Sequence, residues 1–167
     1  MKVTDFIEPG TGVFVEGAFR HLLTREALRA TRYQDFFSVC LLKPDVSAGP
    51  GTTEEDTRQG VSKKIAQFLR STDMVATVED GIAVLLLHTE GSDAIRVAER
   101  IRTHIEQVAF PGEPGGSPRQ VTLSVGGVSF PRDGYNDAVL LSRAQAHLEE
   151  ASKRGGNQVV YAGESRR

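Results

Sequence analysis

Two adjacent carboxylates in a short turn are the residues of this sequence best suited to chemistry. Glu79 and Asp80 stand between two apolar segments and are followed by Gly81. Neighbouring carboxylates can coordinate a divalent cation, and they equally suit a polar turn exposed to water. Asp-Gly between apolar runs also predicts a β-hairpin, because a tight primed turn needs positive φ at both central residues. The pair therefore has two open interpretations, a cation site and a plain hairpin turn.

The other residues that could bind a metal or a phosphate, or act as a nucleophile, lie at positions that favour a structural role. The acidic run Glu54-Glu55-Asp56 follows Thr53 and is typical of a capped helix start rather than a metal site. Cys40, the single cysteine, lies inside an apolar run, so we expect a buried and unreactive thiol. The pair Gly126-Gly127 does not lead into a helix carrying Lys-Ser or Lys-Thr, which argues against a phosphate loop.

Composition and charge exclude several classes of protein. The chain has 167 residues, of which 39% are hydrophobic and 25% charged, enough to bury a core within one domain. The formal net charge of −2 gives no reason to expect a nucleic acid or an anionic membrane as the partner. No apolar run reaches the roughly 18 residues of a membrane span. We expect a cytoplasmic domain that binds neither nucleic acid nor membrane.

Hydrophobic periodicity predicts helices and strands that alternate along the chain. Helical spacing covers residues 15–32, 53–69, 92–108 and 135–154, and strand patterns cover 36–42, 74–78, 82–88, 121–130 and 158–161. This order, with its one hairpin, predicts an α/β fold in which helices flank a mixed sheet. We divide the chain into an irregular lead-in over 1–14, one domain over 15–162 and a frayed tail over 163–167.

The order of elements and several motifs resemble those of the GGDEF domain, the diguanylate cyclase module that condenses two GTP into cyclic di-GMP. The stretch VTLSVGGVSFPRDG, residues 121–134, is similar to a family strand with Thr-x-Ser-x-Gly and a following Pro-x-Asp-Gly. Gly155-Gly156-Asn157 resembles the family's Gly-x-Asn, and Thr11-Gly12-Val13-Phe14 its opening Thr-Gly-Leu. The resemblance covers residues 5–162. It implies the palm-like fold of nucleotide cyclases, which has a ferredoxin-like core, a mixed five-stranded sheet with a β-hairpin, and about four helices.

The positions that would carry cyclase activity depart from the family pattern. The resemblance aligns the signature Gly-Gly-Asp-Glu-Phe with Glu79-Asp80-Gly81-Ile82-Ala83, so the metal-binding and catalytic acids become Gly81 and Ile82. The metal-binding Asp at the end of the first strand falls on Lys43, and a phosphate-binding Lys falls on Ser152. An aliphatic side chain cannot coordinate Mg²⁺. We therefore expect no catalytic residue, no metal site, no cofactor and no enzymatic activity.

One ligand-binding motif of the family is matched. Arg70-Ser71-Thr72-Asp73 has the Arg-x-x-Asp pattern of the family's inhibitory cyclic di-GMP site, at the family's spacing before the signature hairpin. A guanidinium can bond a guanine edge or a phosphate, and a carboxylate accepts hydrogen bonds from guanine N–H groups. The alternative is an Arg that complements the end of a helix dipole, followed by an Asp that starts a strand.

The function expected from this pattern is that of a catalytically inactive GGDEF-like signalling domain that binds a protein partner or forms a homodimer. The first alternative is a receptor for cyclic di-GMP or another nucleotide through Arg70 and Asp73, and a remote one is an active cyclase. A partner-binding domain should expose an apolar patch. We expect that patch on the first helix, near Phe19, Leu22 and Leu23, or on the strand over 82–87.

Overall fold

Helices and strands alternate along the chain in the order that the hydrophobic pattern predicts. The computed structural model describes residues 6–8, 11–45, 53–112 and 115–161. Their helices are α1 (Glu16–Tyr33), α2 (Glu54–Phe68), α3 (Gly91–Gln107) and α4 (Asp137–Lys153). Their strands are β1 (Phe37–Pro44), β2 (Met74–Val78), β3 (Gly81–Leu87), β4 (Leu123–Phe130) and β5 (Gln158–Tyr161). The boundaries lie within two residues of those predicted.

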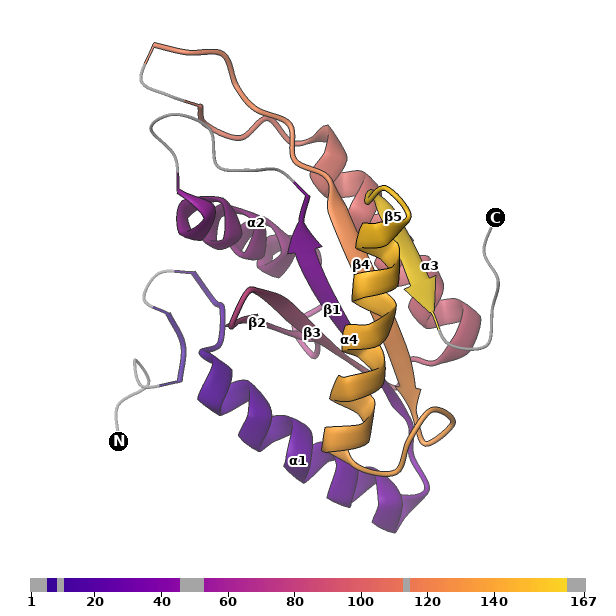
Figure 1. Ribbon diagram of the computed structural model, residues 1–167. Coiled ribbons are helices and arrows are strands. Elements are labelled where there is room, and N and C mark those ends of the chain that lie inside the picture. The colour runs from indigo at the N-terminus through magenta and orange to yellow at the C-terminus, as the bar shows by residue number, and fades with distance from the viewer. Residues whose placement is uncertain (1–5, 9–10, 46–52, 113–114, 162–167) are drawn as a thin grey trace.

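The five strands form one mixed sheet in the order β2-β3-β1-β4-β5 (Figure 1). β1 is antiparallel to both of its neighbours, β3 and β4, whereas β4 and β5 are parallel. Because β1 has a strand on each side and helices on both faces, residues 37–42 are all buried, which explains their nearly continuous apolar character. The predicted α/β fold with a mixed five-stranded sheet, a hairpin and four helices is confirmed.

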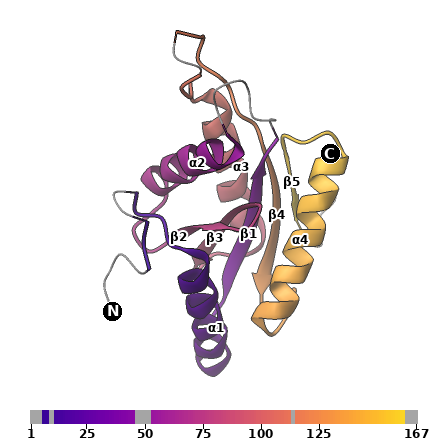
Figure 2. The same cartoon turned by 60° about the vertical axis from the view of Figure 1, so that its left-hand side comes forward.

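The two faces of the sheet bury separate hydrophobic cores. Successive side chains of a strand point to opposite faces, so Val39 and Leu41 pack with α1 and α4, while Cys40 and Leu42 pack with α2 and α3. Figures 1 and 2 show the two pairs of helices on opposite faces of the sheet. Burial raises the pKa of the Cys40 thiol to about 12, in agreement with the unreactive thiol expected from the sequence.

β1 continues two residues beyond its predicted end. Lys43 pairs with Ser124 and Pro44 with Leu123 of β4, although Pro44 had the appearance of a loop residue. The pairing of β1 with β3 ends earlier, at Leu42 and Ile82. On the side of β1 that faces β3, Pro44 is therefore unpaired. Its missing N–H removes no hydrogen bond to β3. Most of the predicted loop over 44–53 lies outside the described residues.

The lead-in is less irregular than predicted, because Phe14 bonds to the edge of the sheet. Its N–H donates to the carbonyl of Val75 at 2.8 Å, and its carbonyl accepts from the N–H of Thr77 at 3.1 Å. Val13 beside it is fully buried. This short parallel bridge covers the edge strand β2, which would otherwise offer unpaired backbone groups. The predicted tail over 163–167 lies outside the described residues.

The residues expected to form the apolar patch are not exposed, although two exposed apolar residues, Leu28 and Tyr33, do lie on the first helix, α1. Phe19 and Leu23 are buried and Leu22 is half-buried, and residues 82–86 of β3 are buried, because both segments supply the cores of the sheet. The large apolar side chains that are exposed in the described part of the chain are Phe6, Leu28, Tyr33 and Tyr135. No described helix is both long enough and apolar enough to cross a bilayer.

α4 packs directly against the backbone of β4 at Gly126. A Cβ added there would lie 2.2 Å from the nitrogen of Leu148 and 2.4 Å from the oxygen of Ala144. A Cβ on the neighbouring Gly127 would lie 2.3 Å from the ring of Tyr161. The glycine pair thus lets a helix and an aromatic ring approach the strand closely, and it does not form a phosphate loop.

We expect Gly126→Ala to destabilise the fold by about 3 kcal/mol, because the added methyl group forces the backbones of α4 and β4 apart. Urea unfolding followed by circular dichroism measures the change. Gly17→Ala is the control, since nothing lies within 4 Å of a Cβ added to this residue of α1. That variant should gain up to about 1 kcal/mol of helix stability. Equal unfolding midpoints for the two variants would contradict this account of the packing.

Candidate functional site

The β2–β3 hairpin presents its two carboxylates at one end of the sheet. Val78 and Gly81 pair with each other, so Glu79 and Asp80 are the two residues of the turn. Only Asp80 of these two has a positive φ, at 66°. The hairpin is confirmed, but the predicted primed turn with two positive φ angles is wrong. Asp tolerates the left-handed region better than most residues do, so Asp80 supplies the one such conformation that this turn uses.

Neither position that the resemblance aligns with the family's two acids presents a polar side chain. A Cβ added to Gly81 would lie 2.5 Å from the carbonyl oxygen of Leu42, so this position has no room for any side chain. Ile82 is fully buried in the core between the sheet and helices α2 and α3. Ala83 is buried on the opposite face. These three residues therefore offer no side-chain ligand for a metal and no group for proton transfer.

A cavity of about 150 Å³ lies between the turn, the end of β1 and the start of α2. Its lining residues are Lys43, Pro44, Glu54, Glu55, Thr57, Arg58 and Asp80. Arg58 is held in place, since its Nη1 donates to the carbonyl of Val78 at 2.6 Å and its Nη2 pairs with Glu55. The bond from Arg58 lowers the pKa of the Glu55 carboxyl. The cavity thus carries charges of both signs, and Arg58 is already committed to Glu55.

The carboxylates that the structure describes around this cavity do not form a cation site. Among the residues that the structure describes, no three His, Cys, Asp or Glu side chains gather closely enough to hold a metal ion. Lys43 lines the same cavity as Asp80, and its ammonium opposes a cation there. The residues present therefore do not fit the Mg²⁺ that the resemblance implies for a cyclase. Glu54, Glu55 and Asp56 instead open α2, where Thr53 and Asp56 form a capping box.

A carboxylate of α1 takes up a backbone amide of the turn. Glu16 accepts a hydrogen bond from the N–H of Glu79. Glu16, Arg20, Glu79 and Asp80 are among the residues that line a second cavity, of about 350 Å³, beside the turn. The resemblance implies that phosphates approach this turn in a cyclase. Here one turn amide is occupied by an internal anion, and three carboxylates surround it.

Ser152 does not take part in the hairpin site. It is exposed on α4 and lines none of the described cavities beside the turn. α4 approaches the turn with Gln145 and Leu148 instead, which line a cavity of about 100 Å³ together with residues 78–82. The position aligned with a phosphate-binding lysine therefore supplies neither a cation nor a contact.

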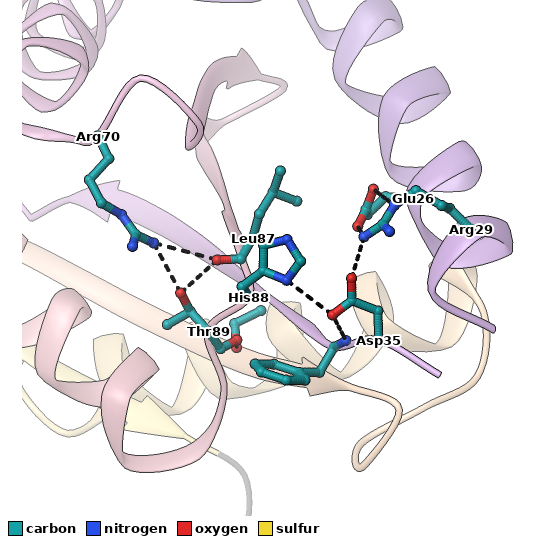
Figure 3. A network of polar contacts seen from close by, with 9 residues as sticks. Glu26, Arg29, Asp35, Arg70, Leu87, His88 and Thr89 are labelled. Atoms are coloured by element: carbon teal, nitrogen blue, oxygen red, sulfur yellow. Dashed lines mark hydrogen bonds and ion pairs between the residues drawn. The ribbon is translucent and has the colours of Figure 1, made fainter. Parts of the chain in front are cut away.

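Arg70 and Asp73 lie together, as their spacing predicts, but they bond to each other. Arg70 Nε and Nη2 donate to the Asp73 carboxylate at 3.2 and 3.3 Å. Arg70 also donates to the carbonyl of Leu87 at 3.4 Å and to the hydroxyl of Thr89 at 3.2 Å (Figure 3). The side chain of Arg70 is 63% exposed, whereas that of Asp73 is 3% exposed. A ligand can therefore reach the guanidinium, while the carboxylate is covered.

Asp45, which follows β1 at the hairpin end of the sheet, organises that end of the molecule and was not among the residues singled out from the sequence. Its carboxylate accepts hydrogen bonds from the hydroxyls of Thr122 at 2.7 Å and Ser124 at 2.5 Å, and from the N–H of Asn157 at 2.8 Å. Gly156 passes so close that a Cβ there would lie 2.8 Å from this carboxylate. Asp45 thus ties the end of β1 to β4 and to the Gly-x-Asn segment before β5. An Asp directly after a buried strand was the available signal.

A second polar network surrounds Asp35 at the opposite end of β1. Arg29 Nη2 lies 2.7 Å from one oxygen of the Asp35 carboxylate, and the other oxygen lies 3.1 Å from His88 Nδ1 (Figure 3). The N–H of Phe36 also donates to this carboxylate, at 2.8 Å. The hydrogen bond from Arg29, followed by that from Phe36, holds the pKa of the Asp35 carboxyl below its usual range.

The family is shown by comparison with known proteins. The family model described as "Diguanylate cyclase, GGDEF domain" matches residues 55–158. This range covers more than half of the chain and contains the hairpin, the Arg-x-x-Asp motif and the Gly-x-Asn segment. The chain therefore belongs to the GGDEF family, as the resemblance of its motifs predicts.

Two curated relatives each match 58% of the chain. It is 31% identical over 98 residues to the response regulator PleD of Caulobacter vibrioides, which is 58% of this chain and 22% of that protein. It is 31% identical over 99 residues to the probable diguanylate cyclase DgcT of Escherichia coli strain K12, with 58% and 22% covered. The chain thus spans about a fifth of the length of these relatives.

Solved structures of GGDEF domains have the same fold. The GGDEF domain of YfiN (TpbB) from Pseudomonas aeruginosa matches with a TM-score of 0.78 and 21% identity, over 93% of this chain and 99% of that one. The GGDEF domain of DgcB from Caulobacter crescentus, in complex with c-di-GMP, gives 0.79 and 17%, over 98% and 97%. Diguanylate cyclase SiaD from Pseudomonas aeruginosa, in complex with its activator SiaC, gives 0.75 and 23%, over 93% and 61%.

We expect Asp35→Asn to flatten the loss of stability in acid. Because the pKa of Asp35 is lower in the folded chain, its contribution is present above the unfolded pKa of about 3.9 and is lost as the pH falls through the lower folded value. Urea midpoints measured between about pH 2 and 6 test this. The control is Asp93→Asn, since Asp93 is 71% exposed in its pair with Arg96. An unchanged acid limb in Asp35→Asn would contradict the assignment.

Proposed function

We propose that this chain is a catalytically inactive GGDEF domain that acts in cytoplasmic signalling by binding a protein partner. The main support for this proposal is the structure of the β2–β3 hairpin. The positions aligned with the family's two acids are Gly81, which has no room for a side chain, and Ile82, which is buried in the core. A hairpin built in this way lacks the groups that would hold a divalent cation or activate a hydroxyl nucleophile.

The charges beside the hairpin also oppose a metal-bound nucleoside triphosphate. Lys43 stands where the resemblance aligns a metal-binding Asp, so its ammonium repels the cation that would accompany the nucleotide, and Glu16 takes up the amide of Glu79. The Asp80 carboxylate faces the same cavity as Lys43. Negative side chains at the turn repel phosphate, and Arg58 is already held by Glu55 and by a backbone carbonyl. The charges at the hairpin end therefore support the proposal that this domain has lost both GTP binding and catalysis.

A role in partner binding is supported by the scaffold, which is kept while the site chemistry is lost. Both cores, the capped α2 and the Asp45 contacts to the Gly-x-Asn segment are intact. The cyclase SiaD, whose fold is similar, has been solved in complex with its activator SiaC. By analogy, we infer that the partner of this chain is a protein, either a separate one or a second copy.

A second candidate function is the binding of cyclic di-GMP at Arg70. The observation in its favour is the 63% exposed guanidinium beside Asp73, in a chain whose fold is shared by a GGDEF domain solved with c-di-GMP. The covered carboxylate weighs against it, because the Arg70–Asp73 pair must open before Asp73 can accept a bond from guanine. Protein binding is therefore the preferred function.

Incubation of the purified chain with GTP and Mg²⁺ or Mn²⁺ should give no cyclic di-GMP, because the hairpin lacks the aligned acids. Liquid chromatography with mass spectrometry measures the product, and an active family member under the same conditions serves as the positive control. Sustained turnover that is lost in Asp80→Asn would refute the proposal and identify Asp80 as a participant.

Calorimetry should detect no heat when cyclic di-GMP is added at high micromolar concentration, since Arg70 and Asp73 already satisfy each other. The matched control is Arg96→Ala, because Arg96 and Asp93 form a pair with the same spacing in the sequence. Binding that Arg70→Ala abolishes and Arg96→Ala leaves intact would establish the second candidate function in place of the first.

A further inference from the structure

An open cavity lies at the end of the sheet remote from the hairpin. It is formed by the end of α1, the segment between α1 and β1, the residue before α3 and the end of β4, and its volume is about 330 Å³. The residues that line it are Ala30, Thr31, Gln34, Asp35, Phe36, Glu90, Phe130, Pro131 and Tyr135. A cavity of this size is large enough to admit a long side chain of another molecule.

The lining combines aromatic rings with carboxylates and includes no Lys or Arg. The rings are those of Phe36, Phe130 and Tyr135, and the carboxylates are those of Asp35 and Glu90. An aromatic face attracts a cation through its quadrupole, and a carboxylate attracts it by charge. The same groups repel phosphates and acidic peptides. The chemistry of the cavity therefore selects a cationic ligand with a flat or apolar body.

Glu90 is the carboxylate that is available to such a ligand. Asp35 is already bonded by Arg29, His88 and the N–H of Phe36. Glu90 is exposed, and its carboxylate makes no hydrogen bond or ion pair with the residues that the structure describes. A cation that enters the cavity can therefore pair with Glu90 without displacing a contact of the fold.

Exposed apolar side chains lie in this cavity and on the helix α1 that helps to form it. Tyr135, which lines it, is 78% exposed, and Tyr33, adjacent to the lining residue Gln34, is 66% exposed. Leu28 is 67% exposed and lies one turn after Thr24 on the same side of α1. This side of α1 faces the start of α4, because the hydroxyl of Thr24 donates a hydrogen bond to Asp137 at 2.6 Å. Leu28 therefore lies on the side of α1 that faces the segment carrying Tyr135. We call Leu28, Tyr33 and Tyr135 the apolar rim.

We propose that this cavity binds an arginine side chain of a separate protein partner, not of a second copy of this chain, and that neighbouring apolar residues of the partner pack on the apolar rim. This inference rests on the proposed function and names the surface and the kind of partner that it uses. Arginine fits better than lysine, because a planar guanidinium can stack on Tyr135 or Phe36 while it donates to Glu90. The partner segment is thus basic and amphipathic.

The test uses N-acetyl-arginine amide as the probe and amide chemical shifts of the full chain as the readout. We expect saturable shifts at residues 30–36, 90 and 130–135, with a dissociation constant in the range of about 1 to 10 mM that suits a single side chain. Glu90→Lys and Tyr135→Ala should each weaken binding about tenfold, which is the effect of losing one charge-assisted or cation–π contact. Both residues are exposed, so both variants should keep the spectrum of the fold elsewhere.

Two controls define the result that would overturn the proposal. Glu54→Lys changes an exposed carboxylate at the hairpin end and should leave probe binding unchanged. N-acetyl-glutamine amide, which lacks the charge, should not bind. Equal binding of the two probes, or shifts spread over all exposed carboxylates, overturns the assignment of the cavity to a cation.

The oligomeric state distinguishes a separate partner from a second copy. Analytical ultracentrifugation should find no self-association that Glu90→Lys disrupts. A dimer disrupted by that substitution would assign the cavity to a second copy and overturn the proposal of a separate partner. Synthesis of cyclic di-GMP from GTP would instead contradict only the proposed function, and probe binding at the cavity would be unaffected by that outcome.

Discussion

The backbone of Gly81 approaches the carbonyl of Leu42 so closely that no side chain fits between the hairpin and the end of β1. This contact fixes the register in which Ile82 pairs with Leu42. In that register Ile82 enters the core, Glu79 and Asp80 are left in the turn, and Lys43 stands beyond the last pair of β1 with β3. The chemistry of the hairpin end follows from this one packing constraint, because it decides which side chains face solvent and which fill the interior.

The two ends of the sheet therefore differ in character. At the hairpin end, charges of both signs lie close together, and some are paired, as with Arg58 and Glu55, or Glu16 and the turn amide. At the opposite end, an aromatic cavity has a free carboxylate in Glu90 and an apolar rim around it. The proposed loss of catalysis at the hairpin end leaves the opposite end free to bind a partner, since the same scaffold supports both.

Most of the fold could be predicted from local sequence patterns. The periodicity of the apolar residues located each helix and strand, and Asp80-Gly81 between apolar runs located the hairpin. What the patterns could not supply were contacts between residues far apart in the chain. Glu16 with Glu79, Asp45 with Asn157 and Phe14 with β2 depend on how the elements pack, which no short window of sequence contains. Leu28 and Tyr33 of the apolar rim were not predicted to be exposed. Helical spacing shows that α1 has an apolar stripe, but it does not show which apolar residues are left outside that stripe.

We propose that the hairpin end of this domain no longer receives a metal-bound nucleotide. The most direct test of this proposal is paramagnetic broadening of backbone amide signals by Mn²⁺ in the presence of a non-hydrolysable GTP analogue. We expect the amides of residues 79–82 and of Lys43 to broaden no more than those of exposed acidic residues elsewhere, such as Asp93. Selective broadening of residues 79–82 that requires the nucleotide would contradict this proposal.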